Sequence, residues 1–115
     1  MLDSAHLFAG IPVREYDAGR RWYERFFGRE PDMLPNDNEA VWHLPETGSV
    51  YVVGDPERAG NGLVALIVDE LDPILAELAG RGLEPDSDTT IPGTVREVPF
   101  TDPDGNTVKV GQPLG

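Results

Sequence analysis

Few side chains in this chain could perform chemistry. The sequence contains two histidines, His6 and His43, and no cysteine, which excludes thiolate chemistry and disulfides. No Ser-His-Asp pattern, phosphate-binding glycine loop or paired-carboxylate spacing accompanies the histidines. Two histidines without an organised set of carboxylates do not make a metal site. We therefore interpret each histidine as a surface or hydrogen-bonded residue.

The charge balance limits the possible partners. Twenty-one acidic residues oppose nine basic ones, giving a formal charge of −12. Such a field repels phosphate backbones, so no nucleic-acid partner is expected, whereas cationic small molecules are attracted. No apolar run reaches the 18 residues needed for a membrane span. The first ten residues lack a signal-peptide pattern, so a cytoplasmic location is expected.

A repeat indicates which elements must position any site. The stretch "GREPD" at 28–32 returns as "GLEPD" at 82–86, 54 residues later. A strand-like and then a helical pattern precede each copy, and three strand-like pieces follow it. The sequence therefore predicts one α+β domain over 1–115, built from two tandem βαβββ modules. We place the modules at about 1–55 and 62–115, with a Gly-rich charged linker at about 55–61.

The predicted helices carry recognisable end signals. Asp17 and Asp72 are expected to cap the two helices, and Pro73 then stands at the first helical position. Gly28 follows the last turn of the first helix, where a left-handed residue commonly ends a helix, and Gly80 or Gly82 ends the second.

Three stretches resemble the vicinal oxygen chelate superfamily, which includes glyoxalase I, extradiol dioxygenases, fosfomycin-resistance enzymes and bleomycin-resistance proteins. They are "IPVREYDAGRRWYERFFGREP", "LIVDELDPILAELAGRGLEP" and "FTDPDGNTVKV". Together they span both modules. The resemblance implies curved mixed sheets that form a cup-like cavity, with the helices outside, and a homodimer. The Asp-Pro-Asp-Gly-Asn segment is in itself a good turn before the last strand.

The resemblance also implies where a metal would be held. Glyoxalase-like members use His and Glu side chains on four strands, on the open side of the sheets. The corresponding positions here are Phe8, Leu63, Lys109 and, to within one residue, Tyr51. Phe and Leu offer no lone pair, and a lysine ammonium repels a cation. We therefore expect neither a divalent metal nor another cofactor.

Strand alternation assigns further side chains to the cavity. His6 shares the face of Phe8, and either Trp42 or His43 faces the cavity. The candidate ligand-binding residues are His6, Phe8, Trp42, Tyr51, Leu63 and Lys109. Three roles stay open for the lysine: a base or Schiff-base nucleophile, a partner for a ligand carboxylate, or an ion pair with Glu97 on a neighbouring strand.

The favoured function is a non-catalytic binding protein of the bleomycin-resistance type. It would sequester an aromatic or cationic metabolite or antibiotic, because aromatic walls bury large ligand area. One alternative is an enzyme: a metal-independent isomerase, lyase or tailoring catalyst, or a metalloenzyme with unexpected ligands such as His6. Another is a relative whose cavity serves only its own dimerisation.

Overall fold

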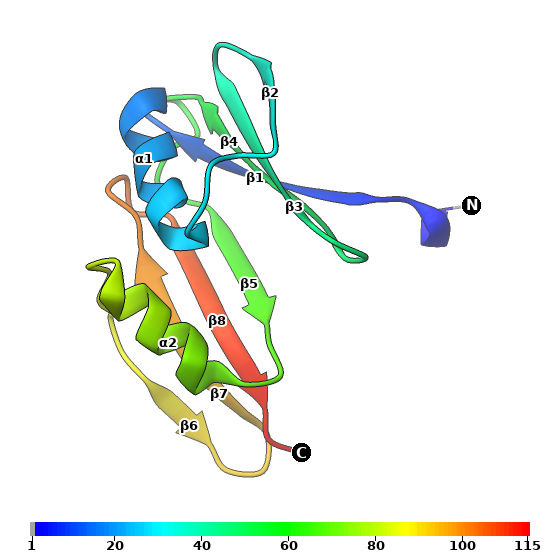
Figure 1. Ribbon diagram of the computed structural model, residues 1–115, viewed down its shortest axis with the longest axis vertical. Coiled ribbons are helices and arrows are strands. Elements are labelled where there is room, and N and C mark those ends of the chain that lie inside the picture. The colour runs from blue at the N-terminus through cyan, green and yellow to red at the C-terminus, as the bar shows by residue number, and fades with distance from the viewer. Residues whose placement is uncertain (1) are drawn as a thin grey trace.

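Each half of the chain forms one helix and one four-stranded mixed sheet (Figure 1). The computed structural model describes residues 2–115. After a 3-10 turn at Leu2–Ser4, the first half contains β1 (Leu7–Val13), α1 (Tyr16–Phe27), β2 (Met33–Asn36), β3 (Glu39–Leu44) and β4 (Gly48–Gly54). The second half repeats this order with β5 (Leu63–Ile67), α2 (Leu71–Gly80), β6 (Thr89–Ile91), β7 (Val95–Thr101) and β8 (Thr107–Pro113). The predicted α+β fold of two βαβββ modules is confirmed.

The two sheets have equivalent topologies. Their strand orders are β1-β4-β3-β2 and β5-β8-β7-β6. In each sheet the first strand pairs in parallel with the last, and the other pairs are antiparallel. The connection from β4 to β5 occupies residues 55–62, which includes the predicted linker.

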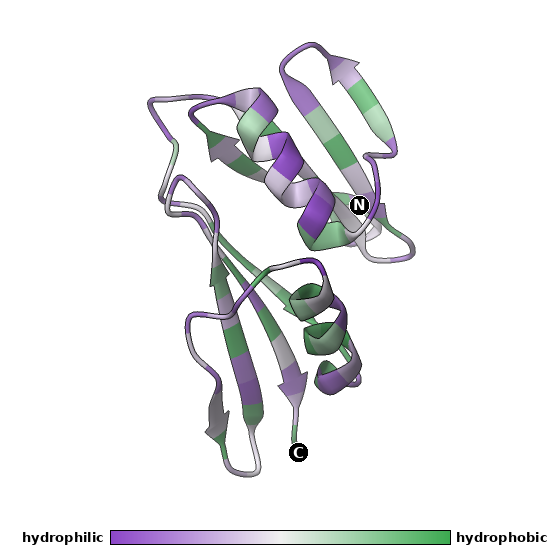
Figure 2. Ribbon diagram, turned by 60° about the vertical axis from the view of Figure 1, so that its left-hand side comes forward, coloured by the Kyte–Doolittle hydropathy of each residue, from purple (hydrophilic) through white to green (hydrophobic). Residues whose placement is uncertain are grey.

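Each helix packs on one face of its own sheet. In α1 the buried residues are Gly19, Tyr23 and Phe26, and Gly19 lies directly over Val13 of β1. A Cβ at Gly19 would come within 2.6 Å of a Val13 methyl group, so the close approach of helix and strand requires glycine. Figure 2 shows that α2 is the more hydrophobic of the two helices.

The helices begin earlier than the sequence predicts. Residues Glu15 and Glu70 occupy the N-cap positions, in extended conformation and without a side-chain capping bond. The predicted caps Asp17 and Asp72 instead lie inside the first turns, where a carboxylate favourably meets the positive end of the helix dipole. The helix ends agree with the prediction: Gly28 is the left-handed C-cap of α1 with φ of 74°, and α2 ends at Gly80, two residues before the left-handed Gly82 with φ of 79°.

A buried polar cluster joins the two modules. The Tyr23 hydroxyl on α1 donates to Asp102 Oδ2 at 2.8 Å, and Phe26 packs edge-on against Phe100 of β7 with ring centroids 5.8 Å apart. The Asn106 side-chain amide reaches the Pro12 carbonyl of β1 at 2.7 Å. The Asp-Pro-Asp-Gly-Asn turn is therefore also a polar contact between the modules.

The sheet faces opposite the helices are open. On these faces the side chains of Phe8, Leu63 and Ile67 are 47%, 84% and 64% exposed. Figure 1 shows the two sheets as separate layers rather than a closed barrel. A single chain thus supplies the walls of a cup without closing it. Among residues 2–115, no helix has the length and apolar character needed to span a bilayer.

Candidate functional site

The open face of the first sheet carries an aromatic pair. Phe8 of β1 and Tyr51 of β4 have ring centroids 6.4 Å apart, and Phe8 remains 47% exposed. Gly10 makes room for the tyrosine, because a Cβ there would come within 2.5 Å of Tyr51 Cζ. Phe8 and Tyr51 lie on the face that strand alternation predicts, and the phenyl ring is accessible to a ligand.

A serine links the two histidines on this face. Ser49 Oγ lies 2.8 Å from His6 Nε2 and 2.7 Å from His43 Nδ1. The His6 ring also makes an edge contact with Phe8, with centroids 5.1 Å apart. Ser49 itself is only 3% exposed. The serine was missed at the sequence level, although it stands two residues before Tyr51 on the same strand and therefore shares its face.

Trp42 is not part of the open face. Its side chain is 0% exposed, stacks on Phe27 of α1 with ring centroids 5.2 Å apart, and donates its indole N–H to the Arg29 carbonyl at 3.1 Å. The proposed ligand-contacting role of Trp42 is therefore wrong, because helix packing takes this tryptophan into the core. His43 is the member of the pair that faces outward.

The main chain of His43 is fixed by the segment after α1. Asp32 accepts the His43 backbone N–H at 2.7 Å, and Arg29 donates to the His43 carbonyl at 2.8 Å. Arg29 also pairs with Asp32 at 2.6 Å. The hydrogen bond from Arg29, followed by that from the His43 backbone, lowers the pKa of the Asp32 carboxyl. These bonds involve only the main chain of His43, whose imidazole bonds to Ser49.

The open face of the second sheet combines an apolar and a charged side chain. Leu63 of β5 and Lys109 of β8 lie beside a cavity of about 190 Å³ that Ala65 and Thr107 also line. The Lys109 ammonium is 3.5 Å from Glu97 on β7. Of the three roles considered for this lysine, the structure shows the ion pair across neighbouring strands.

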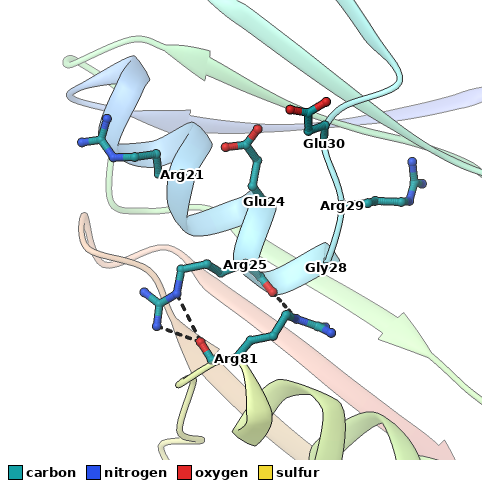
Figure 3. A pocket seen from close by; sticks show the side chains of 7 residues that line it. All are labelled: Arg21, Glu24, Arg25, Gly28, Arg29, Glu30 and Arg81. Carbon is teal, nitrogen blue, oxygen red and sulfur yellow. Dashed lines mark hydrogen bonds between the residues drawn. The ribbon is translucent and has the colours of Figure 1, made fainter.

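A second concave region lies at the C-terminal ends of the helices (Figure 3). This cavity of about 550 Å³ is lined by Arg21, Glu24, Arg25, Gly28, Arg29, Glu30 and Arg81. Arg25 donates to the carbonyl of Arg81 at 3.0 Å, while Arg81 donates to the carbonyls of Arg25 and Phe26. The guanidinium groups of Arg25 and Arg81 therefore donate to carbonyls at the ends of the helices. They link the two helices, and we do not assign them to a ligand site.

Within residues 2–115, no three His, Cys, Asp or Glu side chains gather so as to hold a metal ion. The four positions matched to the metal ligands carry Phe8, Tyr51, Leu63 and Lys109. What the open faces offer instead is aromatic stacking, apolar contact and the hydrogen bonds of the His6–Ser49–His43 cluster.

Several solved structures are similar to this chain over nearly its whole length. A glyoxalase / bleomycin resistance protein from Catenulispora acidiphila DSM 44928 is 39% identical, with 95% of this chain and 98% of that chain covered and a TM-score of 0.90. TnmS3, an antibiotic binding protein from Streptomyces sp. CB03234, is 24% identical with 98% of both chains covered and a TM-score of 0.77. A lactoylglutathione lyase from Agrobacterium tumefaciens is 19% identical with 95% and 93% covered and a TM-score of 0.74. No family model and no curated protein matches the sequence.

Proposed function

The chain belongs to the glyoxalase / bleomycin resistance protein / dioxygenase superfamily, and on that premise we propose that it binds and sequesters a small molecule without a metal. The ligand would be an aromatic or cationic metabolite or antibiotic, held on the open faces of the sheets. Sequestration requires affinity alone and no acid, base or metal.

One observation carries this proposal: the side chains at the metal-ligand positions face the open side but do not fit a divalent ion. Phe8 and Leu63 have no donor atom. Lys109 carries a positive charge and is paired with Glu97. A hard or borderline metal needs carboxylate or neutral imidazole ligands in a fixed geometry. We therefore derive no step that passes through a metal.

The class of ligand follows from what replaces the metal ligands. The exposed Phe8 ring and its neighbour Tyr51 provide a surface on which planar rings can stack. The formal charge of −12 raises the local concentration of cations. The antibiotic binding protein among the structural neighbours shares the fold, which is consistent with such a role but does not identify the ligand.

We also propose that a second copy of the chain completes the cup. Two aliphatic side chains on the open face of the second sheet, Leu63 and Ile67, are more than half exposed, and exposed apolar surface of this kind is typical of an interface. A homodimer would bring the open face of one copy over that of the other. The small molecule would then be enclosed between the two copies.

A thermal-shift screen of divalent metals, antibiotics and aromatic metabolites tests the function. A compound at 100 times its dissociation constant should stabilise the protein by about 2.7 kcal/mol. Phe8→Ala should remove the shift caused by an aromatic compound and leave the fold intact, because the ring is 47% exposed. Leu34→Ala is the matched control, since Leu34 is similarly exposed but lies beside Tyr16 and Arg20 on the helix side.

Two results would contradict the proposal. One is a stabilising shift from a stoichiometric metal that chelation reverses together with a catalytic activity. The other is an aromatic ligand whose shift is the same in Phe8→Ala as in the unmodified protein.

A further inference from the structure

The connection from β4 to β5 contains a reactive pair of residues. Of the four asparagines in the chain, only Asn61 is followed by a glycine. The backbone nitrogen after an asparagine can attack its side-chain amide carbon, and glycine hinders this attack least because it has no side chain. The Asn61 side chain is exposed, and no hydrogen bond within residues 2–115 holds its amide. The sequence and the exposure therefore both favour deamidation at this position.

The reaction consumes only water. The Gly62 nitrogen bonds to the Asn61 side-chain carbon Cγ, the bond from Cγ to the amide nitrogen breaks, and ammonia leaves with the Gly62 proton. The product is a succinimide ring. Water then opens the ring at either carbonyl, which leaves an aspartate or an isoaspartate at position 61. The first step therefore needs a free Gly62 nitrogen and no oxidant, reductant or enzyme.

In the folded chain this nitrogen is not free. The Gly62 N–H donates to Asn106 Oδ1 at 2.7 Å, and the Gly60 N–H donates to the same oxygen at 3.1 Å. The Gly62 carbonyl accepts from the Thr107 N–H at 2.9 Å. Asn106 is only 1% exposed, so bulk water does not compete for its amide oxygen. The backbone on both sides of Asn61 is thus held against the second module.

The same packing explains why position 62 is a glycine. A Cβ at Gly62 would come within 2.8 Å of Asn106 Oδ1, so the close approach of the two residues disfavours any side chain there. Packing against Asn106 therefore creates the unhindered asparagine–glycine pair. Asn106 is also the residue that bonds the reactive nitrogen, so one contact both produces the sensitive pair and protects it.

We propose that Asn61–Gly62 is a site of spontaneous deamidation that Asn106 keeps closed while the chain is folded. Reaction requires a local opening in which the Gly62 N–H leaves the Asn106 oxygen. This inference concerns the covalent state of the chain and goes beyond the proposed function, because it requires no ligand on the open faces.

Deamidation removes the closure irreversibly. An isoaspartate carries the main chain through its side-chain carbon Cγ, which lengthens the backbone by a single carbon atom between Asn61 Cα and the Gly62 nitrogen. The Gly60 and Gly62 N–H groups then lose the spacing with which both reach one oxygen. The new carboxylate also adds a negative charge to a chain whose formal charge is already −12. Each modified molecule therefore has a looser connection between its modules.

Peptide mapping by mass spectrometry tests the protection in the unmodified protein. The whole chain is incubated at mildly alkaline pH, either folded in buffer or unfolded in guanidinium chloride, and the conversion of Asn61 is followed over time. We expect conversion to be at least about tenfold slower in the folded chain, because only the locally opened state reacts. Equal rates in the two states would overturn the proposal.

Hydrogen exchange of the Gly62 amide tests which opening limits the reaction. The same N–H must be released for exchange with solvent and for attack on Asn61, so folding should slow the two reactions by factors that agree within about tenfold. This comparison uses only the unmodified protein. A Gly62 N–H that exchanges as fast in the folded chain as in the unfolded chain would contradict the closure by Asn106.

Two variants separate the Asn106 bonds from overall stability. Asn106→Ala removes the accepting oxygen, and Asn61 in this variant should react at least about tenfold faster than in the unmodified folded chain. Tyr23→Phe removes the bond to Asp102 but leaves the Asn106 oxygen in place. Its rate should stay within about twofold of that of the unmodified folded chain.

The variants can also refute the role of Asn106. An Asn106→Ala chain that is folded and reacts as slowly as the unmodified protein would show that another feature protects Asn61. Tyr23→Phe reacting as fast as Asn106→Ala would show that overall stability, and not the Asn106 bonds, sets the rate. If Asn106→Ala does not fold, the hydrogen-exchange comparison in the unmodified protein decides.

Discussion

At the residue scale, Lys109 shows how one charge can determine ligand preference. Its ammonium faces the open side of the second sheet and is only partly neutralised by Glu97 at 3.5 Å. Lys109→Ala removes a positive charge and frees a carboxylate. We expect weaker binding of an anionic ligand and unchanged or tighter binding of a cationic one, measured by isothermal titration calorimetry. A hundredfold loss of affinity for a cation (about 2.7 kcal/mol) would show that the lysine has another role.

Tyr23 makes stability depend on alkaline pH. Burial of its hydroxyl, followed by the adjacent Asp102 carboxylate, raises the pKa of Tyr23 far above its ordinary value. The unfolded chain therefore loses this proton first, near pH 10. Below pH 10 the protonated Tyr23 hydroxyl makes its full contribution to stability. Above pH 10 the free energy of unfolding should fall by up to about 1.4 kcal/mol per pH unit.

Tyr23→Phe isolates this effect. The variant removes the titrating group, so its free energy of unfolding should decline less steeply with pH above about 10 than that of the unmodified protein. Urea unfolding at a series of pH values measures both slopes. Equal slopes would mean that other groups control the alkaline response.

Residue positions on strands could largely be predicted from the sequence. Alternation correctly places Phe8, Tyr51, Leu63 and Lys109 on the open faces, because a strand permits only two side-chain directions. It could not choose between Trp42 and His43, since that choice depends on which face of β3 the helix covers. Nor does a serine without neighbouring motif residues indicate that two histidines, one just before β1 and one on β3, converge on it.

At the element scale, the turn before β8 connects three parts of the chain through Asn106. Its amide oxygen accepts from the backbone N–H groups of Gly60 and Gly62, and its amide nitrogen donates to Pro12 and Asp102. Asn106→Ala leaves several of these buried groups without partners. We expect the free energy of unfolding to fall by about 3 kcal/mol, measured by urea denaturation.

The matched control is Asn61→Ala, which removes an exposed asparagine side chain from the linker itself. Its effect should stay within about 0.5 kcal/mol. If both variants lose the same stability, the linker is sensitive to substitution in general and the Asn106 bonds are not what holds it.

The order of elements could be predicted because the chain contains each signal twice. The glycine turn after the first helix recurs 54 residues later, and this repeat predicts the same order of elements in both halves. The helix starts were misplaced because a capping residue is recognised by its type, and here Glu15 and Glu70 occupy the caps without capping bonds. Asp17 and Asp72, two residues further along, are of the residue type that commonly caps helices, but they lie in the first turn and interact favourably with the helix dipole.

At the scale of the whole molecule, the exposed open faces predict association. Leu63, the most exposed of the large β5 side chains at 84%, is expected to be covered by the second copy. Leu63→Asp should shift the protein from dimer to monomer in multi-angle light scattering, because an unpaired charge at an interface is costly. Leu34→Asp places the same charge outside the open faces and should remain dimeric. A monomeric unmodified protein would contradict the proposed closure.

How the modules sit relative to each other could not be predicted from the sequence. The contacts that decide it join residues far apart in the chain, such as Tyr23 with Asp102 at 2.8 Å. Nothing in the local pattern of either segment marks these residues as partners. The DPDGN segment was correctly interpreted as a turn. Its hydrogen bonds to Tyr23 and Pro12 of the first module could not be read from the local sequence.

The exchange of arginines between the helices makes the two halves of the chain depend on each other. Arg25 donates to carbonyls at the end of α2, and Arg81 donates to carbonyls at the end of α1. Either half expressed as a separate polypeptide would therefore leave the last carbonyls of its helix without these guanidinium donors. We expect each module to be less stable alone than it is in the whole chain.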